Sequence, residues 1–350
     1  MALLRIILIL FVPILQVSGL ASEAAQLSRG RLLESLSSPS GKLTISPEVM
    51  IPEPQNPTAI LLQTDAVQTL SECIRTAKAN SAWVSGGITS LQTFCSEQER
   101  ARGNFPGPIP VIYCGSEALD PEALVEAGAT GVIVQVCGGG ELESLDQISA
   151  DETFLNLCKN AVECGIQPIP EVTISDATAQ SWSEEDVEKL VETLRSNLDE
   201  IPVSVLLTMN PNDEEQELVS LPKVPKALGK KTPIIGSVRV TAGENRLGTE
   251  VARFKEAGFT GVVLRSDCVP GFRLNPDLDV VGKFWSACIG DLKSTRSKSF
   301  EFNARNNMET HVMTKWANYQ NDVIESGALG DPNDSESVVD STAGEYKGFA

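Results

Sequence analysis

The sequence predicts an α/β protein built as a single (β/α)8 barrel, the TIM barrel, in which eight parallel strands alternate with helices. Three observations predict this fold. Short apolar runs recur along the chain, amphipathic helical patterns separate them, and one helix-to-strand junction recurs 130 residues after its first copy. Eight strand-helix units over roughly 240 residues match the usual size of such a barrel.

Eight apolar runs are the strand candidates. Apolar residues at nearly every position indicate strands that are covered on both faces, as in a parallel sheet. The expected strands are residues 59–63, 82–85, 110–114, 131–136, 167–172, 203–209, 233–240 and 261–265.

Helical patterns fill the segments between these runs. Val67, Leu70 and Ile74, for example, lie on one face of a helix. Helix starts are marked either by a capping residue followed by proline or by a capping-box pattern. These start signals occur at Asp120–Pro121, at Asn275–Pro276 and at Ser183 with Asp186.

An internal repeat supports the barrel. Residues 126–134, EAGATGVIV, recur closely at residues 256–264 as EAGFTGVVL. Each copy ends a helix at glycine and begins a buried strand at once. The first copy precedes the fourth expected strand and the second precedes the eighth, as two equivalent half-barrels would require. A coincidence of two ordinary helix-to-strand loops is the alternative, and it demands the same architecture.

The barrel is expected at residues 58–298, between two segments of different composition. Residues 1–20 combine an arginine, an apolar run and small residues, which is typical of a signal peptide. The run is shorter than the roughly 20 residues of a membrane span, so the mature chain is expected to have none. Residues 21–57 are Ser-rich and poor in acids, like a transit segment and linker. Residues 299–350 predict one more helix at 308–324 and an acidic, partly disordered tail.

The cysteines indicate the redox state of the cellular compartment in which the protein resides. The eight cysteines show no CxxC spacing and mostly fall on apolar stripes, which predicts buried thiols rather than disulfides. Free thiols suit a reducing compartment, whereas a signal peptide leads into the secretory route. A signal peptide followed by a transit segment, as in proteins of secondary plastids, accommodates both and predicts the plastid stroma or the stromal side of the thylakoid. Leu20 stands where such presequences usually carry an aromatic residue, and secretion or a retained anchor is the alternative.

Charge and histidine content exclude several classes of function. The formal net charge of -19 argues against nucleic-acid binding. The single histidine, His311, lies outside the expected barrel, which excludes a Ser-His-Asp triad there and argues against a histidine metal site. We therefore expect no metal and no cofactor. Proton transfer within the barrel would have to use Asp, Glu, Lys, Tyr or Cys.

The order of motifs resembles indole-3-glycerol-phosphate synthase, a family of aldolase-type barrels of tryptophan biosynthesis, over roughly residues 58–292. The motifs are Ile109 to Ile112, Glu126 to Ala129, Glu171–Val172 at the end of the fifth strand, Asn210 at the end of the sixth and Ala257–Gly258. The resemblance implies that Glu171 is a catalytic acid or base of a carbon-carbon lyase and that Asn210 contacts the ligand.

Barrels of this type hold phosphate near the ends of strands 7 and 8. A small phosphorylated ligand is therefore expected there, and two arginines could bind its anionic group. The alternative is that these arginines pair with Glu171 or with other acids of the rim. The candidate residues are Gly236, Ser237, Arg239, Arg265 and Ser266.

The sequence departs from the family where the family carries lysines. Gln63 to Asp65 replace the lysine loop after the first expected strand, and Tyr113 to Gly115 replace the lysine at the end of the third. We therefore expect a divergent barrel without the parent activity, acting as a structural, binding or assembly protein with a plastid protein complex as partner. The alternative is an active lyase on a phosphorylated substrate, using Glu171 with Tyr113, Cys114 or a lysine.

Overall fold

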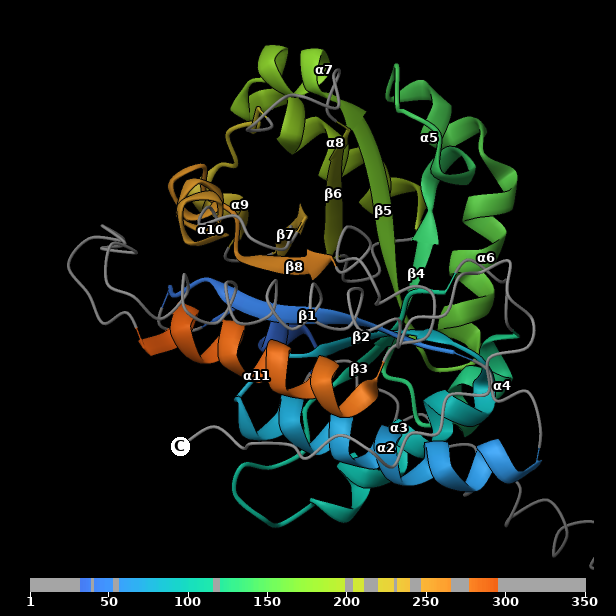
Figure 1. Cartoon of the computed structure of the whole chain (residues 1–350). Helices are drawn as coiled ribbons and strands as arrows, with labels where there is room; N and C mark the ends of the chain where they lie inside the picture. The colour runs from blue at the N-terminus through green and yellow to red at the C-terminus, as the bar shows by residue number, and fades with distance from the viewer. Residues whose placement is uncertain are drawn as a thin grey trace, which may run out of the picture.

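In the computed structural model, eight parallel strands close into one barrel in the order β1 to β8, and helices surround it (Figure 1). This confirms the predicted fold class. The structure describes residues 32–38, 41–52, 57–115, 120–198, 204–210, 220–229, 232–239, 247–265 and 277–294. The strands are β1 Thr44–Ile51, β2 Ala82–Gly86, β3 Val111–Tyr113, β4 Gly131–Gln135, β5 Gln167–Ser175, β6 Val205–Asn210, β7 Ile234–Arg239 and β8 Gly261–Arg265.

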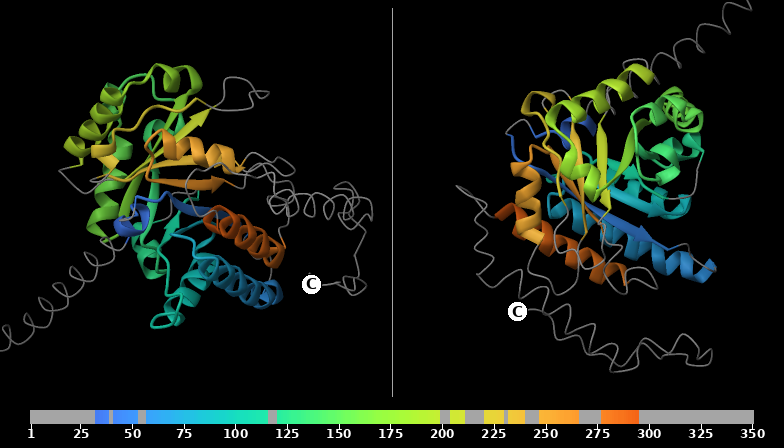
Figure 2. Two further views of the ribbon diagram at one scale, coloured as in Figure 1. Left: turned by 90° about the vertical axis from the view of Figure 1, so that its left-hand side faces the viewer. Right: turned by 90° about the horizontal axis from the view of Figure 1, so that it is seen from above.

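Helices connect the strands, and α2, α3 and α11 lie together on one side of the barrel (Figures 1 and 2). The Asp120 side chain accepts a hydrogen bond from the Glu122 backbone, and Ser183 with Asp186 forms the predicted capping box. The start signal at Asn275 lies outside the described residues. The helices are α2 Pro57–Thr76, α3 Ile88–Arg100, α4 Pro121–Glu126, η1 Val136–Gly139, α5 Asp146–Ala150, α6 Glu152–Glu163, α7 Asp176–Ser181, α8 Glu184–Asn197, α9 Lys226–Gly229, α10 Leu247–Glu256 and α11 Leu278–Ser294.

The first strand is the main correction to the sequence prediction. Residues 59–63 lie in helix α2, and β1 is formed by Thr44–Ile51 instead. The apolar run at 59–63 continues the helical spacing of Val67 and Leu70, whereas β1 carries polar residues at every second position and a proline, Pro47. A strand with polar residues on its inner face gives no continuous apolar run, so the pattern that identified the other strands misses it.

A short helix at residues 32–36, called the closing helix from here on, closes the end of the barrel at which the strands begin. This amino-terminal end is called the lower end of the barrel. Leu32 and Leu36 are fully buried in the barrel interior. The Leu36 carbonyl accepts a hydrogen bond from Thr44, the first residue of β1, and a methyl group added at Gly131, the first residue of β4, would lie 2.9 Å from Leu32. The barrel therefore begins well before the expected boundary at residue 58, inside the segment that was expected to be transit-like.

Two apolar cores stabilise the fold. The outer core lies between the strands and the helices and includes Leu70, Phe94 and Trp285, each fully buried. The inner core fills the lower part of the barrel, and its members come from alternate positions of the strands together with the closing helix. They are Leu32, Leu36, Trp83, Ile112, Ile169, Leu206, Ile235 and Val263. Since the interior is packed with side chains, no open channel runs through this part of the barrel.

The repeated junction has the conformation that its sequence predicts. Gly128 and Gly258 have φ values of 92° and 95°, in the left-handed region that favours glycine. In each copy the helix ends there and the next strand follows three residues later, at Gly131 and at Gly261. The two copies thus occupy equivalent positions before β4 and β8.

The expected signal peptide at 1–20 and the expected helix at 308–324 lie outside the described residues. Within the described ranges, no helix is long and apolar enough to cross a membrane. All seven cysteines in these ranges are free, and Cys95, Cys158 and Cys288 are buried.

Candidate functional site

A polar layer lies above the inner core, toward the carboxyl ends of the strands. In barrels of this type the active site lies at this end. Each strand, or the residue directly after it, contributes one inward-facing side chain to this layer, as the alternation with the two cores shows. These eight residues, called the mouth layer from here on, are Glu48, Ser85, Cys114, Gln135, Glu171, Thr208, Ser237 and Arg265.

Arg265 is the centre of the mouth layer. It is the last residue of β8, and its guanidinium group reaches one carboxylate on the neighbouring strand β1 and another on β5, three strands away around the barrel. Nη1 lies 3.3 Å from Oε1 of Glu48, and Nη2 donates to Oε1 of Glu171. The side chains of Arg265, Glu48 and Glu171 are 19%, 15% and 7% exposed, so the two ion pairs lie largely out of water. Ion pairs in such surroundings are weakly screened by salt.

Glu171 accepts hydrogen bonds from two more side chains. Thr208 on β6 donates to Oε1 at 2.9 Å, and Gln135 on β4 donates to Oε2 at 3.3 Å. The backbone of Gly139 approaches the Gln135 amide closely, since a methyl group added there would lie 2.9 Å from its Oε1. Gly139 also has a φ of 85°, in the left-handed region that favours glycine. A larger residue there would therefore be disfavoured both by its backbone conformation and by contact with Gln135. The loop after β4 therefore fixes the amide that holds Glu171.

Cys114 lies beside Glu48, with its sulfur 3.9 Å from Oε1. Desolvation raises the pKa of the Cys114 thiol well above its usual range, Glu48 raises it further, and Arg265 opposes the rise. The thiol therefore stays protonated near neutral pH, and a thiol is a far weaker nucleophile than a thiolate. Cys114 is thus a weak hydrogen-bond donor to Glu48 rather than a resting nucleophile.

The predicted site residues are placed in different surroundings. Glu171, Ser237 and Arg265 lie together in the mouth layer, and Arg265 makes the pairing with Glu171 that was the alternative to anion binding. Arg239 is exposed at the end of β7. Gly236 faces outward, because a methyl group there would lie 2.0 Å from the Phe254 ring of α10.

Two further predicted residues can be placed only in part or not at all. Asn210 ends β6, where its backbone is paired with Ser175 of β5. Ser266 lies outside the described residues. Tyr113, considered as a partner for Glu171, is buried in the outer core instead.

Glu48, Gln135 and Thr208 were not predicted from the sequence. Glu48 lies in the strand that the apolar pattern missed, and the alternation of Thr44, Ser46 and Glu48 was the signal that could have identified it. Gln135 and Thr208 lie within strands that were predicted. Their inward direction follows from the two-residue period of a strand once one neighbour is placed in a core.

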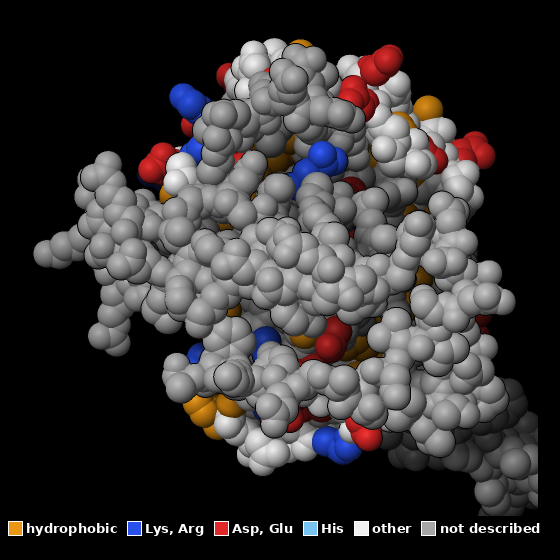
Figure 3. Space-filling view, in the orientation of Figure 1, with side chains coloured by type: hydrophobic (Ala, Val, Ile, Leu, Met, Phe, Trp, Pro, Cys, Tyr) orange, Lys and Arg blue, Asp and Glu red, His pale blue; other side chains and the backbone are white. Residues whose placement is uncertain are grey.

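On one face of the molecule, the described charged side chains are of both signs (Figure 3). On the face in Figure 3, acidic and basic side chains are interspersed around the molecule. Among the described residues, no group of three or more His, Cys, Asp and Glu side chains is arranged to hold a metal ion.

The buried thiols give a prediction about pH. Burial raises the pKa of both Cys95 and Cys158 to about 12. An unfolded chain releases these protons near pH 8.5, about the ordinary value, so above it the unfolded state binds fewer protons than the folded state. The free energy of unfolding is therefore expected to fall as pH rises from about 8.5 toward 12, by up to about 1.4 kcal/mol per pH unit for each thiol.

Urea unfolding at pH 8 and at pH 10 measures this loss. The double variant Cys95→Ala, Cys158→Ala is the control, because it removes both thiols and leaves every other titrating group in place. It is expected to lose less stability between the two pH values than the unchanged chain does. Equal losses in both proteins would show that the buried thiols do not set the alkaline limit.

Comparison with known proteins shows no family for this chain. No family model and no curated protein matches the sequence. Similar solved structures include an N-acetylmannosamine-6-phosphate 2-epimerase from Clostridium perfringens, at 9% identity and a TM-score of 0.39 over 68% of this chain and 90% of that one. Methylornithine synthase has 11% identity and a TM-score of 0.40 over 71% and 79%. An N-acetylneuraminic acid synthetase from Leptospira borgpetersenii serovar Hardjo-bovis has 12% and 0.39 over 81% and 93%.

At these values the similarity carries no activity over to this chain. The expected membership of the indole-3-glycerol-phosphate synthase family stays a prediction. What the chain does must therefore be argued from its own mouth layer.

Proposed function

We propose that this barrel does not catalyse the indole-3-glycerol-phosphate synthase reaction and acts as a structural, binding or assembly protein. The observation that carries the proposal is the state of Glu171, whose carboxylate accepts hydrogen bonds from Arg265, Thr208 and Gln135. A carboxylate whose two oxygens already accept from three donors has few acceptor sites left for a substrate. No lysine or histidine occurs among the eight residues of the mouth layer, so the lysines of the parent family have no counterpart there. The other proton-transfer groups of the layer are Glu48, which is paired with Arg265, and the buried thiol of Cys114.

The proposed compartment is a plastid, reached by a signal peptide followed by a transit segment. The arginine, apolar run and small residues of residues 1–20 support the signal peptide. The free cysteines of the described ranges support a reducing compartment. Fusion of residues 1–31 to a fluorescent protein tests this proposal, and secretion of the fusion would refute it.

The proposed partner is a plastid protein complex. The acidic composition of the chain, with a formal charge of -19, supports a partner with a basic docking surface over one made of nucleic acid. The intact protein is then expected to co-purify with other plastid proteins. Recovery as a lone monomer at low ionic strength would count against an assembly role, because charge pairing is strongest there.

An active lyase on a phosphorylated substrate is the second candidate. It is favoured by the position of Glu171 at the carboxyl end of the barrel, where catalytic acids of such folds lie. Arg239 is exposed at the end of β7 and could contact a phosphate together with Ser266. In this case Arg265 would serve to hold Glu171 and Glu48 in place.

A thermal-shift titration with indole-3-glycerol phosphate and with its indolic analogues separates the two candidates. A ligand that binds the folded state stabilises it by about 2.7 kcal/mol at 100 times its dissociation constant. We expect no shift at millimolar concentrations and no turnover. A dose-dependent rise in melting temperature that Arg239→Ala abolishes, with turnover that Glu171→Gln abolishes, would establish the lyase instead.

A further inference from the structure

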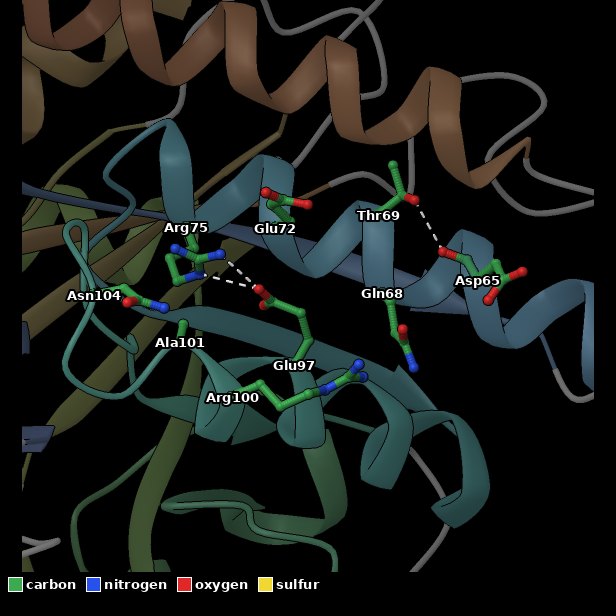
Figure 4. A pocket seen from close by; sticks show the side chains of 9 residues that line it. All are labelled: Asp65, Gln68, Thr69, Glu72, Arg75, Glu97, Arg100, Ala101 and Asn104. Atoms are coloured by element: carbon green, nitrogen blue, oxygen red, sulfur yellow. Dashed lines mark hydrogen bonds and ion pairs between the residues drawn. The ribbon is translucent and has the colours of Figure 1, made fainter.

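A groove of about 450 Å3 runs between helices α2 and α3 on the outside of the barrel, away from the mouth layer (Figure 4). Asp65 and Glu72 line it from α2, and Arg100 and Asn104 line it from α3 and the loop that follows.

The floor of the α2–α3 groove is a buried ion pair with all its partners in place. Nη2 of Arg75 lies 2.6 Å from Oε1 of Glu97, and the Arg75 side chain is only 9% exposed. Ser71 donates to the other carboxylate oxygen at 2.9 Å, and Nη1 of Arg75 donates to the Pro106 carbonyl at 2.8 Å. The floor therefore joins the two helices to the loop after α3 and leaves no group of its own for a ligand.

The walls differ from the floor. Asp65, Glu72 and Arg100 are exposed. Among the described residues none of the three forms an ion pair. The α2 wall therefore carries two acids and the α3 wall one base.

An exposed aromatic ring borders the lower end of the groove. Phe105 is 89% exposed, and it lies between Asn104, which lines the groove, and Pro106, which is bonded to the groove floor. Its described contact is the Lys78 ammonium, 5.8 Å from the ring centroid. A large apolar side chain exposed to this extent favours contact with another apolar group.

The described chain ends close to this border. Helix α11 runs alongside α2, since a methyl group at Gly282 would lie 3.2 Å from Cβ of Cys73. At its end, Nζ of Lys293 donates to Oδ1 of Asn80 at 2.8 Å and to the Lys78 carbonyl. Residues 295–350 therefore leave the described structure beside the end of α2 that carries Arg75 and within reach of Phe105.

The first residues beyond α11 complement the groove. Residues 295–305 read TRSKSFEFNAR, with three basic residues, two phenylalanines and one acid. The bases match Asp65 and Glu72, the acid matches Arg100, and the phenylalanines match Phe105. At about 3.3 Å per residue this segment can span roughly 36 Å, while α2 rises only about 15 Å between Arg75 and Asp65.

We propose that residues 295–305 form a strap that lies in the α2–α3 groove, with Lys298 against Glu72 and an aromatic contact to Phe105. The occupant is a segment of the same chain, and the inference does not depend on whether the barrel catalyses a reaction. The strap covers Phe105 and holds the residues that follow it against one side of the barrel.

Carbodiimide cross-linking of the full chain, mapped by mass spectrometry, tests the strap because it joins a lysine to a carboxylate only when the two are in contact. A Lys298–Glu72 link within one chain is expected. Glu72→Gln should abolish that link, and Glu188→Gln, which removes an exposed acid on α8, should leave it unchanged. The charge-swapped variant E72K/K298E should restore a link between the two positions.

Three results would overturn the strap. One is the absence of any link to Lys298. Another is a set of links spread evenly over exposed acids, including Glu188. The third is a link found only between two chains, which would make a second copy the occupant of the groove.

Discussion

A chain that begins at residue 47 is expected to remain unfolded, whereas a chain that begins at residue 31 folds and unfolds cooperatively. The shorter chain lacks Leu32 and Leu36, which fill the lower end of the barrel, and it lacks the first residues of β1. Residues 44–46 pair with β8, whereas residues 48–51 pair with β2, so the truncation removes most of the contact that closes the barrel between β1 and β8 and leaves the β8 edge unpaired.

Circular dichroism and thermal melts of the two chains measure this difference. The matched control is the longer chain with Leu32→Ala, which should fold but lose about 2–5 kcal/mol of stability, the usual range for removing a buried leucine side chain. A cooperative transition at the same melting temperature in the chain from residue 47 would disprove the role of the closing helix. If the prediction holds, any cleaved presequence ends before residue 32.

Replacing Arg265 with methionine is expected to lower the free energy of unfolding by about 3–5 kcal/mol, the usual cost of breaking a buried ion pair from one side. The variant leaves Glu48 and Glu171 close together in the barrel with no guanidinium between them. The reason for the cost is the desolvated charge that stays behind, more than the attraction that is lost.

Urea unfolding measures this cost, and an exposed pair supplies the control. Arg102 contacts Glu99 at 2.7 Å, but both side chains are more than 60% exposed, so Arg102→Met should cost at most about 1 kcal/mol. The double variant Arg265→Met, Glu171→Gln should lose less than the sum of the two single losses, because one stranded charge is gone. A cost for Arg265→Met as small as that of Arg102→Met would show that the mouth layer is solvated.

The sequence identifies seven of the eight strands because their outward residues face a helix layer and their lower inward residues face the inner core. Both faces are apolar along much of each strand, as in Ile234 and Ile235 of β7. β1 does not have two apolar faces, because Thr44, Ser46 and Glu48 all point inward. Its place is set by closure of the barrel, and the only local signal for it is this alternation of polar residues.

Only some residues of the candidate site were predictable from the sequence, and their arrangement was not. Glu171 and Arg265 could each be assigned to the end of a strand, yet their contact joins β5 to β8 across the barrel. Which charge pairs with which depends on the lengths of side chains that meet inside a closed sheet. Glu48 shows this most clearly, since it shares Arg265 with Glu171 and lies in the strand that the apolar pattern missed.

The closing helix also gives the molecule a direction. The chain enters the barrel at its amino-terminal pole, where residues 32–36 lie, and the mouth layer opens at the opposite pole. A translocation pore or a surface that binds the upstream residues therefore holds the barrel at the pole opposite the mouth layer. In that orientation the mouth layer faces away from the point of attachment. A partner that binds Glu171 and Arg265 must then approach from the opposite side.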